Sequence, residues 1–519
     1  MTTPEPPPLR FEVGGAGWKR ARRHLAAAGY RLTPSGSVSG RAVFWDTADG
    51  RLGRQGLRLL LWEEREAWRL VLVHPSGREE DLARGMGKAP FGPVLDPASW
   101  EVPAGRGGLL GAKPLVPLAA AHLRIRSFTL RSPTGRPLRA EVQAPAPREG
   151  GGVPSLLQVA AASAEGAASL GHLEVLLRDR AGLKPAEGDL ASQLRRGQGP
   201  GDPSREARAE SPLRPEEPLS AAGRRLLGRQ LSRLEANVPW ALGDLHPEFV
   251  HDARVAARRA RTLLRLLGPA LGPRRSESLR AELRWAAGLL GEVRDLDVFL
   301  AAWDRQAARL PPGLPGPDTL RAVVAGERAG ALEALREGLS SRRFHRLLQR
   351  IRRLVLSPPP SRPRGAAAER TSEAARRLVR RTGKRALAAA EALGPDPAPE
   401  ALHRLRILFK RARYAAEFFR EVLPQEAEDL IAAAVDLQEA LGAHQDAVVA
   451  AVRLRRAVEA GRAPEGELLA AGALLQGFWQ SAAAARADLG ERLGRFRKAY
   501  RKLRRSPPPS PETSGTAPP

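Results

Sequence analysis

The pattern of hydrophobic and polar positions changes character near residue 218. Between residues 9 and 182, apolar residues come in short runs that glycine and proline turns separate, and many are β-branched or aromatic. The clearest runs occupy residues 41–47, 57–64, 68–75, 122–130, 138–143 and 172–179. This pattern predicts a mostly antiparallel sheet, with an early helix near Gly17 to Ala28.

After residue 218 the apolar positions recur at helical spacing in segments rich in Leu, Ala, Arg and Glu. A proline-rich break at residues 357–364 divides this all-helical region into halves at about 218–356 and 371–505. The polar stretch 183–217 is typical of a linker between the helical domain and the domain at 9–182. Residues 1–8 and 506–519 are expected to be disordered.

The two helical halves are repeats of each other. HDARVAARRARTLLRLL starts at His251, and HRLRILFKRARYAAEFF starts at His403. Basic residues fall at the same offsets in both segments, pairing Arg254 with Arg406, Arg258 with Lys410, Arg259 with Arg411, and Arg261 with Arg413. Further along, LGEVRDLD and LGAHQDAV pair Gly291 with Gly442 and Asp295 with Asp446. A repeat of about 151 to 152 residues is too long for a solenoid and indicates a duplicated helical bundle.

The repeated segments place their cations on one helix face. Offsets 0, 3, 7 and 10 from each histidine fall within an arc of about 80°, so each repeat presents one histidine and three cations as a stripe. Like charges at this spacing repel by a few tenths of a kcal/mol per pair. An anion that relieves the repulsion explains the clustering. The alternative is a solvated basic face whose histidine caps or packs locally.

The overall charge agrees with an anionic partner. The chain has 84 Lys and Arg against 57 Asp and Glu, a net charge of +27. Nucleic acid, anionic membrane and phosphate polymers all fit this charge, as does a merely basic surface. Arginine favours phosphate because its planar fork grips two oxygens at once. Asp295, Asp297 and Asp446 cannot bind phosphate directly, so we expect them to orient arginines. The two aspartates in LGEVRDLD are too few to specify a metal site.

Composition also excludes several chemistries. The absence of cysteine excludes disulfides, thiolate zinc sites and cysteine nucleophiles, and it fits a reducing cytoplasm. The first residues do not have the pattern of a secretory signal, and no run approaches the roughly 20 apolar residues of a membrane span. The abundance of Ala, Arg, Gly, Leu and Pro resembles the output of a GC-rich bacterial genome. We expect no cofactor and no metal.

From about Leu219 to Arg505 the chain resembles the CHAD family, the conserved histidine α-helical domain, on its duplicated HxxRxxxRRxR pattern and the LGxVRDLDV and LGxHQD segments. The resemblance implies two pseudo-symmetric four-helix bundles that bind inorganic polyphosphate in a basic groove between them. The binding residues that it implies are His251, Arg254, Arg258, Arg259, Arg261, His403, Arg406, Lys410, Arg411, Arg413 and His444, with Asp295 and Asp446 in support. His444 has no symmetric partner, because Val293 stands at its position in the first half.

Residues 9–182 resemble the CYTH, or triphosphate tunnel, family in VFWDTADGRLGRQGLRLLL, where Arg58 would point inward. Weaker matches are HLRIRSFTL with Arg124 and Arg126, LRAEVQ with Glu141, and HLEVLL with Glu174. Active members carry E-x-E-x-K to hold a metal and triphosphate. Here Glu12 stands alone between Arg10 and Gly14, and Val73 replaces an expected lysine. The resemblance therefore implies a degenerate tunnel-like domain.

Together these patterns predict an α+β antiparallel tunnel-like domain followed by an all-α domain of two pseudo-symmetric four-helix bundles. The predicted function is non-enzymatic binding of inorganic polyphosphate or other phosphate polyanions, in the cytoplasm or at polyphosphate granules, with no membrane partner. One alternative is a metal-dependent tri- or polyphosphatase that uses the N-terminal domain. Another is a nucleic-acid binder, which the 5% aromatic content and the lack of a known module disfavour. If both motifs form one site, their helices must face each other across a pseudo-twofold axis.

Overall fold

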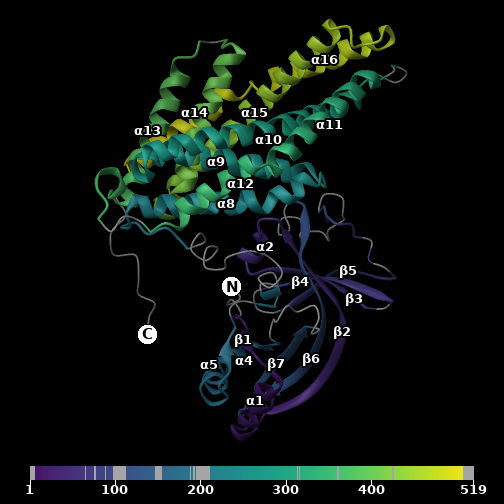
Figure 1. Ribbon diagram of the computed structural model, residues 1–519, viewed down its shortest axis with the longest axis vertical. Coiled ribbons are helices and arrows are strands. Elements are labelled where there is room, and N and C mark those ends of the chain that lie inside the picture. Colours follow the sequence, from purple (N-terminus) through teal and green to yellow (C-terminus); the bar gives the residue numbers. More distant parts are fainter. Residues whose placement is uncertain are drawn as a thin grey trace. The chain divides into compact units, whose positions relative to one another are not determined.

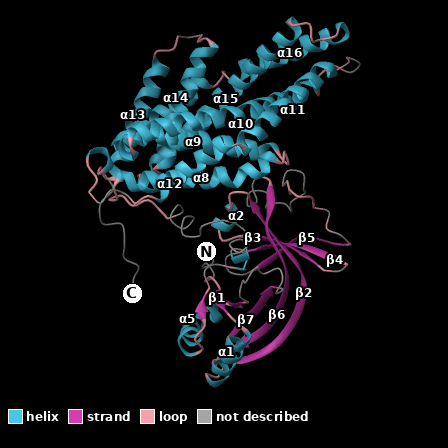
Figure 2. Cartoon of the chain, viewed as in Figure 1, coloured by secondary structure: helices cyan, strands magenta, loops and turns pink. Residues whose placement is uncertain are grey.

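The protein consists of two compact units, residues 1–203 and 204–519. A computed structural model describes residues 6–505 except positions 65, 75–77, 88, 90, 97–112, 146–154, 187–188, 191–192, 195–210, 312–313, 315, 359–361, 395 and 424–425. The first unit is built around strands and the second of helices (Figure 2). The expected tail at 506–519 and most of the expected N-terminal disordered residues lie outside the described residues.

The N-terminal unit contains one antiparallel sheet whose long strands β2 and β6 curve strongly (Figure 1). The strand order is β5-β4-β3-β2-β6-β7-β8-β1-β9. The strands are β1 (Leu9–Glu12), β2 (Arg31–Thr47), β3 (Arg58–Glu63), β4 (Ala67–Val73), β5 (Glu79–Met86), β6 (Leu115–Arg131), β7 (Pro137–Pro145), β8 (Leu156–Ala161) and β9 (Lys184–Pro185).

Helices flank this sheet: α1 (Gly15–Ala27), α2 (Arg51–Arg54), α4 (Ala164–Ala167) and α5 (Leu170–Val175), the last continued by a π-helical turn at Leu176–Arg180. The predicted early helix and five of the predicted strands are confirmed. The strand predicted at 172–179 is wrong, because that segment is helical. Leu170, Leu173 and Leu177 are buried there at spacings of three and four residues, which put them on one helix face.

The residues predicted as a linker, 183–217, have structured ends. Leu190 and Leu194 are buried against Ala42 and Phe44 in the core of the N-terminal unit. At the other end, Leu213 is buried and its backbone N–H donates to Glu421 of the helical unit. Positions 195–210 lie outside the described residues.

The helical unit repeats a series of five α-helices. The first half has α8 (Leu219–Leu242), α9 (Pro247–Leu271), α10 (Pro273–Ala307), α11 (Asp318–Ser340) and α12 (Arg342–Leu356). The second half has α13 (Thr371–Glu391), α14 (Pro399–Phe418), α15 (Glu426–Glu459), α16 (Leu468–Ala484) and α17 (Leu489–Arg505). Short 3₁₀ turns lie at Gly365–Ala367, Arg420–Val422 and Glu465–Glu467.

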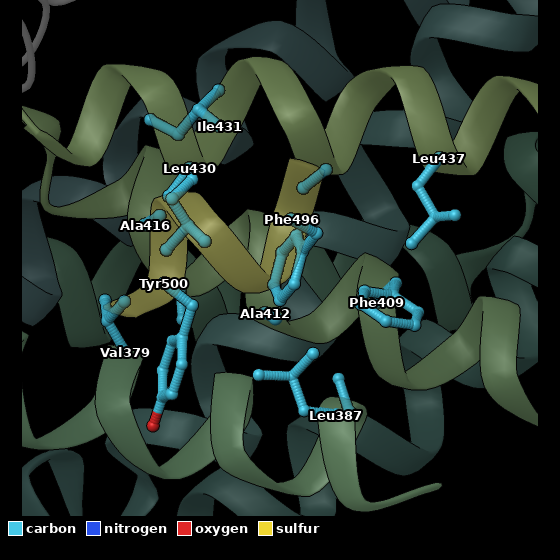
Figure 3. Close-up of a cluster of buried hydrophobic side chains, with 14 of the residues drawn as sticks. Val379, Leu387, Phe409, Ala412, Ala416, Leu430, Ile431, Leu437, Phe496 and Tyr500 are labelled. Atoms are coloured by element: carbon cyan, nitrogen blue, oxygen red, sulfur yellow. The ribbon is translucent and has the colours of Figure 1, made fainter. Parts of the chain in front are cut away.

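Four helices of each half form a bundle, so the predicted fold class is confirmed. In the second half α13, α14, α15 and α17 enclose Phe409, Leu437, Phe496 and Tyr500 (Figure 3). In the first half α9 and α10 pack against each other, and α8 and α12 complete the bundle. Among the described residues, no helix combines the length and apolar character that crossing a membrane requires.

The helix of each half that lies outside its four-helix bundle, α11 or α16, connects the two halves. It pairs with the C-terminal part of α10 or α15, and the two long hairpins lie side by side (Figure 1). Their shared core contains Phe299 and Trp303 of α10 and Phe478 of α16. This contact holds the bundles together, and it leaves α9 and α14 to meet where their basic stripes lie.

Candidate anion-binding site

Helices α9 and α14 carry the duplicated motif and pack against each other between the two halves. Each begins with proline and glutamate, Pro247 and Glu248 in α9 and Pro399 and Glu400 in α14. Proline already has the backbone angle of a first helical residue, and an acid suits the positive end of a helix. The local sequence thus starts both helices at equivalent positions, so their basic stripes are in equivalent register.

The two motif helices are joined by contacts between their side chains. Arg258 of α9 donates from Nε to the hydroxyl of Tyr414 at 3.1 Å. Arg259 is ion-paired with Glu417 of α14, and its guanidinium carbon lies 4.9 Å from the ring centroids of both Tyr414 and Phe418. Such cation–π contacts fix a guanidinium on an aromatic face. The expected meeting of the two motif helices is therefore present.

Four basic side chains converge between α9 and α14, and we call Arg254, Arg258, Arg406 and Lys410 the central cluster. Burial, followed by the charge of Arg258 and the other nearby arginines, lowers the pKa of Lys410 to about 6. Burial also lowers the pKa of Arg406, whose Nε is buried and has no hydrogen-bond partner among the described residues. The cluster thus concentrates positive charge where water screens it poorly, an arrangement that an anion would stabilise.

Two aspartates lie beside the central cluster in equivalent places. Arg254 donates from Nη1 to Asp295 Oδ1 at 2.6 Å. Burial raises the pKa of Asp446, while the charge of Arg406 opposes that rise. The two carboxyl groups also repel each other. Arg254 is therefore held by an acid, and the negative charge of Asp446 acts on Arg406.

Two repeated glycines lie under these same arginines. A Cβ at Gly291 would lie 3.7 Å from the guanidinium of Arg254, and one at Gly442 would lie 3.6 Å from that of Arg406. These are ordinary van der Waals distances, so an alanine fits and a larger side chain would displace the guanidinium. The repeated glycines keep the backbone of α10 and α15 close to the cluster.

Comparison with known proteins identifies the domain that carries this cluster. The family model of the CHAD domain matches residues 225–455. The helical unit contains a CHAD domain. An uncharacterized protein in each of two strains of Mycobacterium tuberculosis is 33% identical over 262 residues, which are 50% of this chain and 50% of the relative. The chain thus matches about half the length of these curated relatives.

Solved structures are similar to the same region. The crystal structure of the CHAD domain from the plant Ricinus communis is 24% identical, with a TM-score of 0.44, and the match covers 58% of this chain and 96% of that one. PptA from Streptomyces chartreusis is 22% identical, with a TM-score of 0.44, and the match covers 55% of this chain and 100% of that one.

The other predicted arginines of the CHAD domain lie outside the central cluster. Arg259 and Arg413 both pair with Glu417, the latter at 3.2 Å. Arg261 and Arg411 are near other arginines of α9, α10 and α13. The duplicated offsets therefore contain both paired and unneutralised cations, a difference that helical spacing does not reveal.

The three predicted histidines have different surroundings. His403 is exposed on α14, and His251 is half-buried on α9. His444 is buried, and its Nδ1 is 3.0 Å from the carbonyl oxygen of Ala482 in α16. His444 therefore packs between α15 and α16, as its apolar counterpart Val293 packs in the first half.

Sequence reasoning missed Tyr414 and Glu417, which bind the arginines of the opposite helix. They stand where the first repeat has Thr262 and Arg265. The two repeats differ in residue type at these offsets, and comparing them beyond their shared basic positions would have revealed both residues. Glu417 is the more informative, because it reverses the charge found at the equivalent position.

The carboxylates singled out by the tunnel-like resemblance in the N-terminal unit are Glu12, Glu141 and Glu174. Glu12 and Glu141 lie on strands β1 and β7, whereas Glu174 lies on α5, where its side chain is 45% exposed and pairs with Arg178. Across the described part of the chain, only Glu248, His251 and Asp252 bring three possible ligand atoms within 4.8 Å of one another. Arg294 donates to Glu248 at 3.2 Å, so this group already has a counter-charge.

Polar side chains inside the N-terminal sheet interact with other residues of the same unit. Arg58 lies 3.4 Å from Asp189, and Arg10 donates to Gln158 at 3.2 Å. Arg58 thus has an inward position, with its side chain 11% exposed. Asp189 of the same unit therefore supplies a counter-charge beside Arg58.

Proposed function

We propose that the CHAD domain binds inorganic polyphosphate, or a closely similar phosphate polyanion, at the central cluster. The observation that supports this best is the burial of Lys410 among arginines from both halves of the domain. CHAD domains are linked to polyphosphate binding in general, which supports the same ligand class. The remaining predicted ligands and the expected cytoplasmic location stay predictions.

The charges of the central cluster explain why a phosphate polymer suits it. Asp295 and Asp446 offset part of the charge of Arg254, Arg406 and Lys410, whereas Arg258 donates to the uncharged hydroxyl of Tyr414. Arginine offers paired donors that match phosphate oxygens, and lysine adds a point charge. A polymer supplies several phosphates at once, and its binding releases condensed counterions. We therefore expect affinity to fall steeply as salt increases.

Replacing Arg258 or Arg406 with alanine should weaken the binding of long-chain polyphosphate about fivefold or more at moderate salt. Each charge-assisted bond to phosphate contributes about 1 to 3 kcal/mol, and 1.4 kcal/mol corresponds to about tenfold. The measurement is a titration of the full chain with polyphosphate at two salt concentrations. RNA of equal charge serves as the competing polyanion.

The matched control is Arg462→Ala, which removes the same charge from a half-exposed side chain paired with Glu327 at 2.8 Å. Its effect should be small and should fade with salt, because it changes only the screened surface field. Equal losses at Arg258, Arg406 and Arg462 would show that net charge alone decides binding. Equal affinity for RNA would instead favour a general polyanion binder.

We further propose that the N-terminal unit is a degenerate CYTH-like domain without phosphatase activity. Metal-assisted hydrolysis requires several carboxylates around Mg²⁺ or Mn²⁺. Glu12 lacks the neighbouring acid and lysine, and Glu174 is half-exposed on α5, where it pairs with Arg178. The set of metal ligands that a tri- or polyphosphatase, the main alternative function, would need is therefore incomplete.

We expect the full chain to release no phosphate from tripolyphosphate or polyphosphate above background when Mg²⁺ or Mn²⁺ is added. Glu12→Gln should therefore change nothing. The assay measures free phosphate over time with each metal. Metal-stimulated release that disappears in Glu12→Gln would establish the enzyme instead.

A further inference from the structure

The two motif helices of the CHAD domain, α9 and α14, differ in charge near their C-terminal ends. Fourteen positions after its histidine, α9 has Arg265, whereas α14 has Glu417. Because the repeats share basic residues at offsets 3, 7, 8 and 10 from the histidine, this reversal makes the two sides of the central cluster chemically different.

On the α14 side, Glu417 neutralises the cations around it. Its two carboxylate oxygens pair with Arg259 of α9 and Arg413 of α14. The side chains of Arg259 and Glu417 are 15% and 17% exposed, so this pairing is mostly buried. A phosphate polymer would meet a carboxylate here, and its two arginine donors are already occupied.

On the α9 side, the equivalent positions contain only cations. Arg411, Arg265 and Arg261 take the places of Arg259, Glu417 and Arg413. Two arginines of α10 add to them. Besides burial, the charges of Arg280 and Arg284 lower the pKa of Arg261, and the charges of Arg265 and Arg280 lower that of Arg411. Counting from Gly291 and Gly442, the second half has Ile431 and Val435 where α10 has Arg280 and Arg284.

We call Arg261, Arg265, Arg280, Arg284 and Arg411 the α9 flank. Among the charges described around Arg261 and Arg411, none is acidic. Within the described part of the flank, the one acid pair is that of Arg280 with Glu277, whose side chain is 62% exposed. The flank therefore concentrates positive charge, and the described residues around it supply few acidic side chains to balance that charge.

The α9 flank is continuous with the central cluster. Arg254, Arg258, Arg261 and Arg265 follow one another on α9 at spacings of four, three and four residues. These positions lie within an arc of about 60° and extend about 16 Å along the helix. A linear polyanion can follow such a stripe, whereas an anion of a few phosphates is too short to reach both ends.

We propose that a polyphosphate chain bound at the central cluster continues along the α9 flank, so that it leaves the shared surface on one side only. This rests on the proposed function and adds to it a direction and a preference for longer chains. The pseudo-symmetric fold thus binds its polymer asymmetrically. On the other side, Glu417 neutralises Arg259 and Arg413, so that side offers the polymer no free arginine at these positions.

The test compares Arg265→Glu with Arg455→Glu in the full chain. Both residues are exposed, and Arg455 lies on α15 in an i,i+4 pair with Glu459. Affinities are measured for long-chain polyphosphate and for tripolyphosphate. Arg265→Glu should weaken long-chain binding about tenfold or more, whereas Arg455→Glu should weaken it about twofold or less. Tripolyphosphate binding should respond equally to both variants.

Arg284→Glu is the second variant, and it should reproduce the long-chain loss from a different helix. If the flank and control variants lose the same affinity for long-chain polyphosphate, the one-sided path is wrong. If Arg258→Ala still weakens polyphosphate binding in that case, the proposed function stands. An equal loss of tripolyphosphate and long-chain binding in Arg265→Glu would also overturn the one-sided path, since the flank would then belong to the central site. If the unaltered protein binds neither ligand, both proposals fail together.

Discussion

Replacing Glu417 with alanine should lower the free energy of unfolding of the helical unit by about 2 to 4 kcal/mol, because it leaves two mostly buried arginines without their acid. Arg259 and Arg413 share this carboxylate, and their side chains are 15% and 22% exposed. Without it they face Tyr414 and the cations of the central cluster. Breaking a buried pair from one side is strongly destabilising for this reason.

The change is measured by urea unfolding followed by helical circular dichroism, with the slope compared between variants. Glu459→Ala is the control, since its carboxylate pairs with Arg455 in the same i,i+4 arrangement and is 64% exposed. That variant should lose about 0.5 kcal/mol or less. Similar losses in both variants would show that Glu417 acts as an ordinary surface charge.

The affinity for polyphosphate should increase as pH falls from about 8 to about 6, by up to about tenfold per pH unit. The reason is that Lys410 must take up a proton before it can form an ion pair with the polymer. Burial and neighbouring arginines lower its pKa from 10.5 to about 6 in the ligand-free protein. A bound phosphate chain favours the charged form and raises this pKa again. Each binding event therefore takes up close to one proton at neutral pH.

The lowered pKa of Lys410 also makes stability depend on pH. The unfolded chain holds the Lys410 proton more tightly than the folded protein, so this group makes the ligand-free protein less stable as pH falls from about 10 to about 6. Below pH 6 the lysine is protonated in both states, and its contribution no longer changes. Binding and folding thus respond to pH in opposite directions.

Other charged groups face Lys410, so the experiment needs a variant that isolates it. Arg254 and Arg258 approach from α9, Arg406 and Arg413 from α14, and Asp446 from α15. Lys410→Arg retains a permanent charge and should remove most of the pH slope. Calorimetry in buffers of different ionisation enthalpy counts the protons directly. An unchanged slope in Lys410→Arg would assign the pH dependence to other groups.

Much of the fold follows from local patterns in the sequence. Strands such as β2 and β6 and the helix α1 were predictable, because alternation and helical spacing are properties of a short stretch of chain. The segment at 172–179 was not, since a run of leucine and valine fits a strand or a buried helix equally well. Packing against the core of the N-terminal unit decided that it is helical.

The candidate site was predictable only in part. Duplicated offsets identified Arg254, Arg258, Arg406 and Lys410 as equivalent cations, and repeated aspartates pointed to partners for two of them. The same offsets gave no reason to separate Arg258 from its neighbour Arg259. In the structure Arg258 contacts the hydroxyl of Tyr414 in the central cluster, whereas Arg259 is neutralised by Glu417.

The sequence by itself determined that the chain has a sheet domain and a duplicated, strongly basic helical domain, because periodicity, repetition and net charge are read along the chain. Only the tertiary structure decided which cations are buried together, which are paired, and on which side Glu417 neutralises its neighbours. Those properties depend on side chains about 150 residues apart that meet between α9 and α14. The pKa of Lys410 follows from that meeting, since burial and neighbouring charge exist only once the two halves have packed.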